Sequence, residues 1–340
     1  MTDYVAQGWN GYAGWGDQSA LATAAATSKY NAVESIQISE KRPATPMKDI
    51  RQGRQLISRS LGNITADVSA SGSLYPDDYA SSRIFENICN LDTVSGSSTA
   101  GYTHVFAESS AIANFKLFGE TIHAHQGGQN TNTLKRAVGA FLKSFSLNSP
   151  ESGPLKWNAS YIARSSDNAA GSLATAAYST VLPFESWMCT VKIGDSIAGV
   201  AAIDVKDWTF SVEMNPKLIF QQGGATNGRY ATKIIFGQPT YSVTMNKLTE
   251  DDFNTYYAYF SSDALKSIVL DVLHTTLAGS STGYHQITIA LPRMMIDEEN
   301  SGLNGTDDQS FSLKFTALKG LVDTLYACNI TVVNSTAGTY

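Results

Sequence analysis

Residues 61–72 read LGNITADVSASG, and residues 236–247 read FGQPTYSVTMNK. In both stretches a glycine precedes a run in which polar and apolar side chains alternate, as they do in a β-strand with one buried and one exposed face. Gly62 holds the same place in the first stretch as Gly237 holds in the second. The shared pattern predicts that the same long strand occurs twice in the chain.

The neighbouring segments repeat at nearly the same spacing as the two glycines. VESIQISE begins at Val33 and VKDWTFSV begins at Val205, and both alternate after the valine. PDDYASSRIFE begins at Pro76 and EDDFNTYYAYF begins at Glu250, and each carries a pair of aspartates near its start. Three matches in the same order, with few identities, indicate an ancient internal duplication or convergent patterning rather than a recent copy.

Each half is expected to follow one plan. A first strand leads through a loop into the long strand, which we place at 55–71 and again at 229–246. A short helix follows, beginning at Pro76 in the first half and spanning 250–260 in the second. Further alternating strands, separated by turns rich in Gly and Ser, complete each half.

The composition agrees with a β-rich chain that has two cores. The 340 residues are 43% apolar and only 16% charged, with 16 Tyr and 14 Phe, and this length suits two domains. We therefore predict a mainly β fold of two tandem β-sandwich or barrel domains, each with a short flanking α-helix. The domains are placed at 31–175 and 176–340, after an N-terminal arm at 1–30.

Residues that could carry chemistry are few. The sequence has no nucleophile elbow, zinc-protease motif, Walker loop or dinucleotide fingerprint. His123 and His125 lie on one face of a predicted strand, but without a third ligand an exposed polar face is favoured over a metal site. The aspartate pairs at 77–78 and 251–252 open the predicted helices, where carboxylates suit the helix dipole. We expect no enzymatic activity, no metal and no cofactor.

Charge and cysteine content limit the partners and the compartment. The net charge of −6 argues against a protein that grips nucleic acid through its phosphates. The three cysteines have neither disulfide nor zinc spacing, and the first residues lack the pattern of a signal peptide. No run of 18 apolar residues is present. We expect synthesis in a reducing cytoplasm and no contact with membranes.

The order of segments resembles a known family. The first half carries GNITADVSASGSLYPDDY, then YTHVF, then FLKSFSLNSPESGPLKWNASYIAR. The second half carries LPFESWMCTVKIGDSIAGVAAIDVKDWTFSVEMN, followed by FGQPTYSVT. This order resembles the tail tube (major tail) proteins of bacteriophages with long, non-contractile tails, over about residues 30–330.

The resemblance implies a structural protein of the virion tail. Its members self-assemble into stacked rings around a channel through which DNA is delivered into the host. The partners it implies are further copies of the chain, the tape measure protein, the tail terminator and the tail tip proteins. DNA would pass only transiently, and the chain would be made in the host cytoplasm.

Two other classes of protein remain as alternatives. Another virion component, such as a capsid or decoration protein, would more usually show a long amphipathic helix and an extended arm. A carbohydrate-binding β-sandwich would explain the aromatic content and would present an aromatic platform on one sheet face. Trp157, Trp187 and Trp208 fall instead in separate predicted strands.

Assembly follows from the duplication if the resemblance holds. Two like domains per chain favour three chains in a ring, with pseudo-sixfold order, over six chains that each place one domain outside. The loops at 41–54 and 214–228 have no core of their own, and we expect them to become ordered only against a neighbouring ring. Deleting residues 43–52 is expected to leave a folded monomer that no longer polymerises.

Strand period alone predicts which side chains line the channel. The apolar face of each repeated strand must meet the core, so the polar face points away from it. That face is small and rich in hydroxyl and amide groups; the alternative to a channel lining is a solvated outer sheet face. The candidate channel-lining residues are Ser35, Gln37, Ser39, Asn63, Thr65, Asp67, Ser69, Asp207, Thr209, Ser211, Gln238, Thr240, Ser242 and Thr244.

Overall fold

The structure is a computed structural model in which most of the chain is described. The described residues are 12–46, 59–78, 83–108, 119–125, 134–169, 178–221, 229–248, 253–302, 310–318 and 326–337. Within them the fold is mainly β, as predicted, with two α-helices, α1 (Arg83–Cys89) and α2 (Phe253–Ser261). Neither of these described helices is long and apolar enough to cross a membrane.

One antiparallel arrangement of eight strands contains the repeated segments. The first half contributes β3 (Ser35–Lys41), β6 (Thr65–Ser73), β11 (Lys156–Ala169) and β10 (Leu134–Ser149). The second half contributes β14 (Asp207–Glu213), β17 (Thr240–Leu248), β20 (Ser310–Ala317) and β19 (Tyr284–Gly302). Their pairing order is β3-β6-β11-β10-β14-β17-β20-β19.

The two sets of four strands match in register as well as in order. Ser35 lies opposite Ser71, and their counterparts in the second half, Asp207 and Asn246, also lie opposite each other. The hairpin β10–β11 has an irregularity between Leu142 and Ser144, and the hairpin β19–β20 has one between Ile296 and Glu298. The bulged positions, 143 and 297, therefore correspond. Their spacing is shorter than that of the other repeated segments, and the sequence comparison did not find it.

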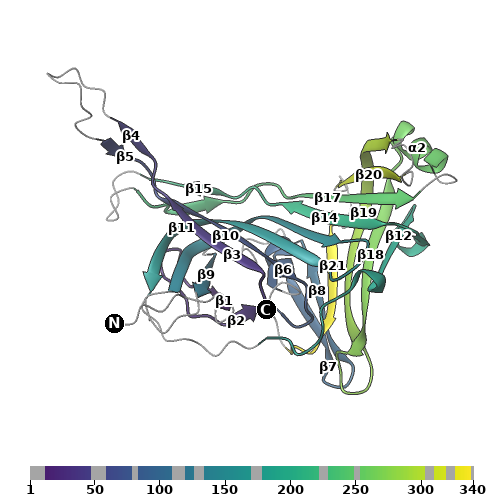
Figure 1. The fold of residues 1–340 in the computed structure, drawn as a ribbon, viewed down its shortest axis with the longest axis horizontal. Coiled ribbons are helices and arrows are strands. Elements are labelled where there is room, and N and C mark those ends of the chain that lie inside the picture. The colour runs from purple at the N-terminus through teal and green to yellow at the C-terminus, as the bar shows by residue number, and fades with distance from the viewer. Residues whose placement is uncertain are drawn as a thin grey trace.

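The remaining strands complete a second layer and the sides. In the first half these are β1 (Tyr12–Asp17), β2 (Lys29–Asn31), β7 (Asp92–Ser97), β8 (Gly101–Ala107) and β9 (Glu120–His125). In the second half they are β12 (Cys189–Gly194), β13 (Ala201–Ile203), β18 (Lys266–Leu277) and β21 (Asn329–Asn334). Figure 1 shows β14 and β17 running across one side of the molecule, with β1, β2 and β9 beneath.

Both halves share one hydrophobic core. A single cluster of buried side chains includes Trp15 and Trp157 from the first half and Trp208 and Phe315 from the second. Strand β21, near the end of the chain, pairs with β8 of the first half. The described part of the predicted N-terminal arm contributes β1, which pairs with β9. The division at residue 175 lies outside the described residues and stays a prediction.

The long alternating strand is interrupted in both halves, which corrects the sequence prediction. In place of one strand over 55–71 there are β5 (Arg59–Leu61) and β6, and in place of 229–246 there are β16 (Lys233–Ile235) and β17. Gly62 lies at the first break and donates its N–H to Pro43 O at 2.7 Å. At the second break, a Cβ on Gly237 would lie 2.4 Å from Asn215 O. Each glycine permits a close backbone approach that stops the ladder.

The loops between the repeated strands form two hairpins. Strand β4 (Ala44–Pro46) pairs with β5 and projects from the body of the molecule (Figure 1). Strand β15 (Lys217–Ile219) pairs with β16, and Leu218 packs with Ala231 and Phe141 in a second small core. The expectation that this second loop has no core is therefore wrong. Residues 47–58 and 222–228 lie outside the described part of the chain.

Candidate channel surface

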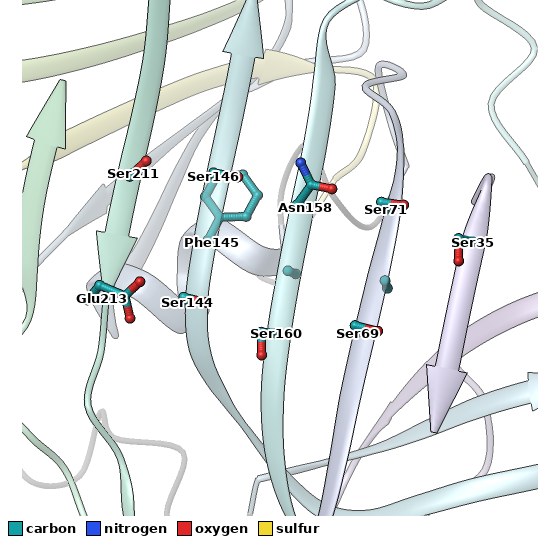
Figure 2. Close-up of a pocket in the computed structure, with 12 residues that line it drawn as sticks. Ser35, Ser69, Ser71, Ser144, Phe145, Ser146, Asn158, Ser160, Ser211 and Glu213 are labelled. Atoms are coloured by element: carbon teal, nitrogen blue, oxygen red, sulfur yellow. The ribbon is translucent and has the colours of Figure 1, made fainter. Parts of the chain in front are cut away.

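The polar face of the eight-stranded arrangement contains a hollow of about 410 Å³. Figure 2 shows it crossing five strands that lie side by side, from β14 through β10, β11 and β6 to β3. Its lining is dominated by short hydroxyl side chains, and Glu213 is its one ionisable side chain among the described residues. The polar lining residues are Ser35, Ser69, Ser71, Ser144, Ser146, Asn158, Ser160, Ser211 and Glu213.

One row of directly paired residues crosses seven of the eight strands. Following the register from β3 to β20, each residue lies opposite the next one on the neighbouring strand. Every member is a serine, threonine or asparagine, so the row is uncharged and its side chains are short. The row is Ser35, Ser71, Asn158, Ser146, Ser211, Ser242 and Thr316.

The alternation predicted from the sequence is present in all four repeated strands. The candidate residues on β3, β6, β14 and β17 are exposed or half-buried, whereas their neighbours Val68, Phe210 and Val243 are buried. Two candidates, Asn63 and Gln238, lie in the bends before β6 and β17 rather than in the strands. The structure brings twelve of the fourteen candidates onto one strand face. Whether that face lines a channel is a separate question of assembly.

Sequence reasoning missed the middle of the surface. The pairs β3–β6 and β14–β17 do not touch; β11 and β10 lie between them. These two strands contribute Ser144, Ser146, Asn158 and Ser160 to the hollow. The signal was present, because FLKSFSLN and LKWNASY alternate in the same way. Alternation does not say which strands become neighbours.

Several charges on this face lie beside a charge of opposite sign. Three lysines, absent from the predicted set, share the face near its ends. Lys41 forms an ion pair with Asp67. Lys156 forms one with Glu34, which lowers the pKa of that carboxyl, and Lys156 Nζ also donates to Ser73 Oγ at 3.0 Å. Lys314 lies opposite Glu298 in the β19–β20 register.

Hydrogen bonds between strands hold two asparagine side chains of this face in place. Asn148 Nδ2 donates to Thr209 Oγ1 at 2.9 Å, across the junction between β10 and β14. Asn246 Nδ2 donates to Asp207 Oδ1 at 2.7 Å, across the next junction. Hydrogen bonds between neighbouring strands leave fewer free donors for a phosphate.

The two histidines of the HxH motif are buried, which corrects the expectation of an exposed strand face. His123 Nε2 lies 3.0 Å from Ala25 O, and the His125 ring stacks on Tyr12. Burial lowers the pKa of both imidazoles. The described residues contain no group of three or more His, Cys, Asp or Glu side chains arranged to hold a metal ion.

The first aspartate pair connects distant segments instead of opening a helix. Asp77 and Asp78 lie in a turn, and α1 is described from Arg83. Asp78 accepts hydrogen bonds from Ser179 N at 2.8 Å and Ala32 N at 3.2 Å, and burial raises its pKa to about 6. The second pair, at 251–252, lies outside the described residues.

Comparison with known proteins agrees with these observations. No curated protein sequence matches the chain. A family model described as phage tail tube protein matches residues 8–317, which include all of the eight-stranded arrangement and the hollow. Because the match covers most of the chain, this protein belongs to the phage tail tube protein family and is a structural component of the virion tail.

Proposed function

We propose that the chain assembles into rings that stack into the tail tube, and that the polar face of the eight-stranded arrangement lines the channel for DNA. The observation that carries this proposal is the uncharged row from Ser35 to Thr316, which runs through seven neighbouring strands of both halves. On the eighth strand, β19, the residue opposite Thr316 is Met295, which is also uncharged.

The chemistry of the face suits passage of DNA rather than its capture. Each cationic contact to a phosphate releases counterions and adds affinity, so a wall rich in Lys and Arg would retain DNA. Here the lysines at 41 and 156 form ion pairs with carboxylates, and the central row carries no charge. A solvated outer sheet face would more usually carry many unpaired Lys and Glu side chains.

The shared sheet also favours three chains in each ring. Each half supplies four strands in the same order to one surface, which supports the division into tail-tube-like domains at 31–175 and 176–340. Three chains then give true threefold and pseudo-sixfold order. In a ring of six chains one half of each would lie outside, where a matching polar row has no use. A reconstruction made without imposed symmetry decides between them, and six equivalent chains would overturn the threefold ring.

The remaining parts of the proposal concern the partners, the place of synthesis and the absence of enzymatic activity. The partners are the tape measure, tail terminator and tail tip proteins, with DNA present only in transit and no membrane contact. The protein is made in the host cytoplasm, has no enzymatic activity and needs no cofactor. Its proposed role is structural, as the wall of the assembled tube.

The test adds positive charge to the proposed lining. The double variant Thr65→Lys with Thr240→Lys is expected to form normal tubes but to slow or block DNA ejection from otherwise intact phage. The matched control is Thr93→Lys with Thr275→Lys, which adds the same charge at exposed positions on β7 and β18. Equal ejection rates for the two variants would overturn the proposal. So would a map with residues 65 and 240 on the outside of the tube.

A further inference from the structure

The eight-stranded arrangement ends in two open edges. Among the described residues, β3 pairs only with β6, and residues 295–302 of β19 pair only with β20. An open edge presents a row of backbone N–H and C=O groups that a further strand satisfies. One edge belongs to the first half and the other to the second.

The pairing of β10 with β14 inside the chain is a model for how these two open edges could pair with each other. Strand β10 ends the first set of four strands and β14 begins the second, and Ser146 lies opposite Ser211 where they pair. Strand β19 corresponds to β10, because the matching bulges align position 297 with position 143. Strand β3 corresponds to β14, with Ser35 in the place of Asp207.

We propose that residues 298–302 of one copy pair antiparallel with residues 37–41 of the next copy, in the register of the β10–β14 junction. In these two alignments Asn300 corresponds to Ser146 and Ser39 corresponds to Ser211, so Asn300 lies opposite Ser39. The same register places Glu298 opposite Lys41 and Gly302 opposite Gln37. This inference rests on the proposed ring, and it adds the residues that close it.

The charges on the polar face of the two edges are complementary in this register. Glu298 and Lys41 are both exposed and lie on the same polar face, as an opposed pair of unlike charge. On the other face, Glu299 Oε1 is buried and has no hydrogen-bond partner among the described residues. In the proposed register Glu299 lies directly opposite Glu40 of the next copy, and Arg42, which forms an ion pair with Glu40, is the nearest cation, as a diagonal neighbour.

The backbone groups along the open edge of β3 point the same way as those of β14 at the β10–β14 junction. Met214 N donates to Lys143 O at 2.8 Å, so positions 210 and 212 direct their backbone groups toward β10. Because Ile38 corresponds to position 210, its carbonyl points out of the open edge. It accepts a hydrogen bond from Lys135 Nζ at 2.7 Å. In the single chain Lys135 therefore occupies part of this edge. It must share or release the Ile38 carbonyl when residues 298–302 of another copy pair there.

Cysteine pairs test the register directly. Directly opposed residues on antiparallel strands have Cα atoms about 4.5–5.5 Å apart, which suits a disulfide. We expect Ser39→Cys with Asn300→Cys, in a Cys189→Ser background, to give a ladder of covalent oligomers in oxidised tubes, ending at the ring size. Ser35→Cys with Asn300→Cys lies four positions out of register, roughly 13 Å apart, and should give no ladder. Ser146→Cys with Ser211→Cys should form an internal disulfide and no ladder.

The outcomes separate this register from the proposed function. A ladder from Ser39→Cys with Asn300→Cys, and from no other pair, supports both the register and the proposed ring. If tubes form and the internal control oxidises but the first pair does not cross-link, the register is wrong while the tube stands. A ladder of equal strength from the shifted pair also overturns the register. If the unmodified chain forms neither rings nor tubes, the proposed function fails and this inference fails with it.

Discussion

Strands β3 and β14 correspond to each other in the two halves but have different surroundings. Strand β14 has a partner on each side, and Trp208, Phe210 and Val212 on its inner face are buried. Among the described strands β3 has one partner, and Ile36, which corresponds to Trp208, is only half-buried. The difference separates a junction that the chain completes by itself from an edge that, in the proposed ring, another copy would complete. Four predictions test this comparison, in order of decreasing effect.

The largest effect is expected from proline at matched positions of β10 and β19. Leu147→Pro removes an N–H from the in-chain junction and should prevent folding or cost ~3 kcal/mol or more. Ser301→Pro makes the same change at the open edge, where proline is tolerated. It should leave the melting temperature of the monomer unchanged and abolish tubes. Thermal unfolding and electron microscopy check both variants, and tubes from Ser301→Pro would break the comparison.

The next effect concerns the buried face. Trp208→Ala should lower the free energy of unfolding by about 3–5 kcal/mol, because the ring fills space in a closed core. Ile36→Ala changes the corresponding position of β3, and in the monomer it should cost about half as much or less, since that side chain is partly exposed. Denaturant unfolding of both variants measures the two costs. Equal costs would mean that β3 is as complete as β14.

A pH effect is expected at the contacts of Asp78. Its carboxyl holds Ala32, which precedes β3, and Ser179, which lies in the link between the halves. Burial raises its pKa from 3.8 to about 6, so the ionised form is less favourable in the folded chain than in the unfolded chain. The contribution of Asp78 to the free energy of unfolding is therefore highest below about pH 4. It falls by about 3 kcal/mol as the pH rises through 6.

Thermal unfolding of the monomer from pH 4 to pH 7 measures this change. Asp78→Asn should flatten the profile between pH 4 and 6. Asp195→Asn, which changes a carboxylate that is 88% exposed, should leave the slope as it is. A profile that Asp78→Asn does not alter would remove Asp78 as the cause.

The smallest effect is expected from charge at the open edges. Lys41→Glu and Glu298→Lys should each raise the concentration of chain needed for assembly by a few-fold, because an exposed pair contributes less than ~1 kcal/mol. The double variant restores opposite charges and should recover most of the loss. Sedimentation at a series of concentrations measures the shift. Lys314 already lies opposite Glu298 within the chain. If the losses of the two single variants simply add in the double variant, Glu298 does not pair with Lys41 of the next copy.

The faces of the strands were predictable and their neighbours were not. Alternation is a local property, so the sequence alone placed Thr65, Asp67 and Ser69 on one face of β6. The insertion of β10 and β11 between the repeated pairs depends on contacts between residues far apart in the chain. The helix start was misplaced because Asp77, with φ of 64°, lies in a turn. The HxH motif is buried because His125 stacks on Tyr12 of β1 and His123 contacts Ala25. The β1–β9 pairing that brings these segments together could not be predicted from either strand.

The bulge at Lys143 has a mechanical consequence. Before it β10 pairs with β9, and after it β10 pairs with β14, so one continuous strand belongs to both layers. Tension applied to the polar face is therefore passed to the opposite layer through covalent bonds. It does not depend on side chains sliding past each other in the core. In the proposed tube, such strands would resist separation of the wall into an inner and an outer sheet.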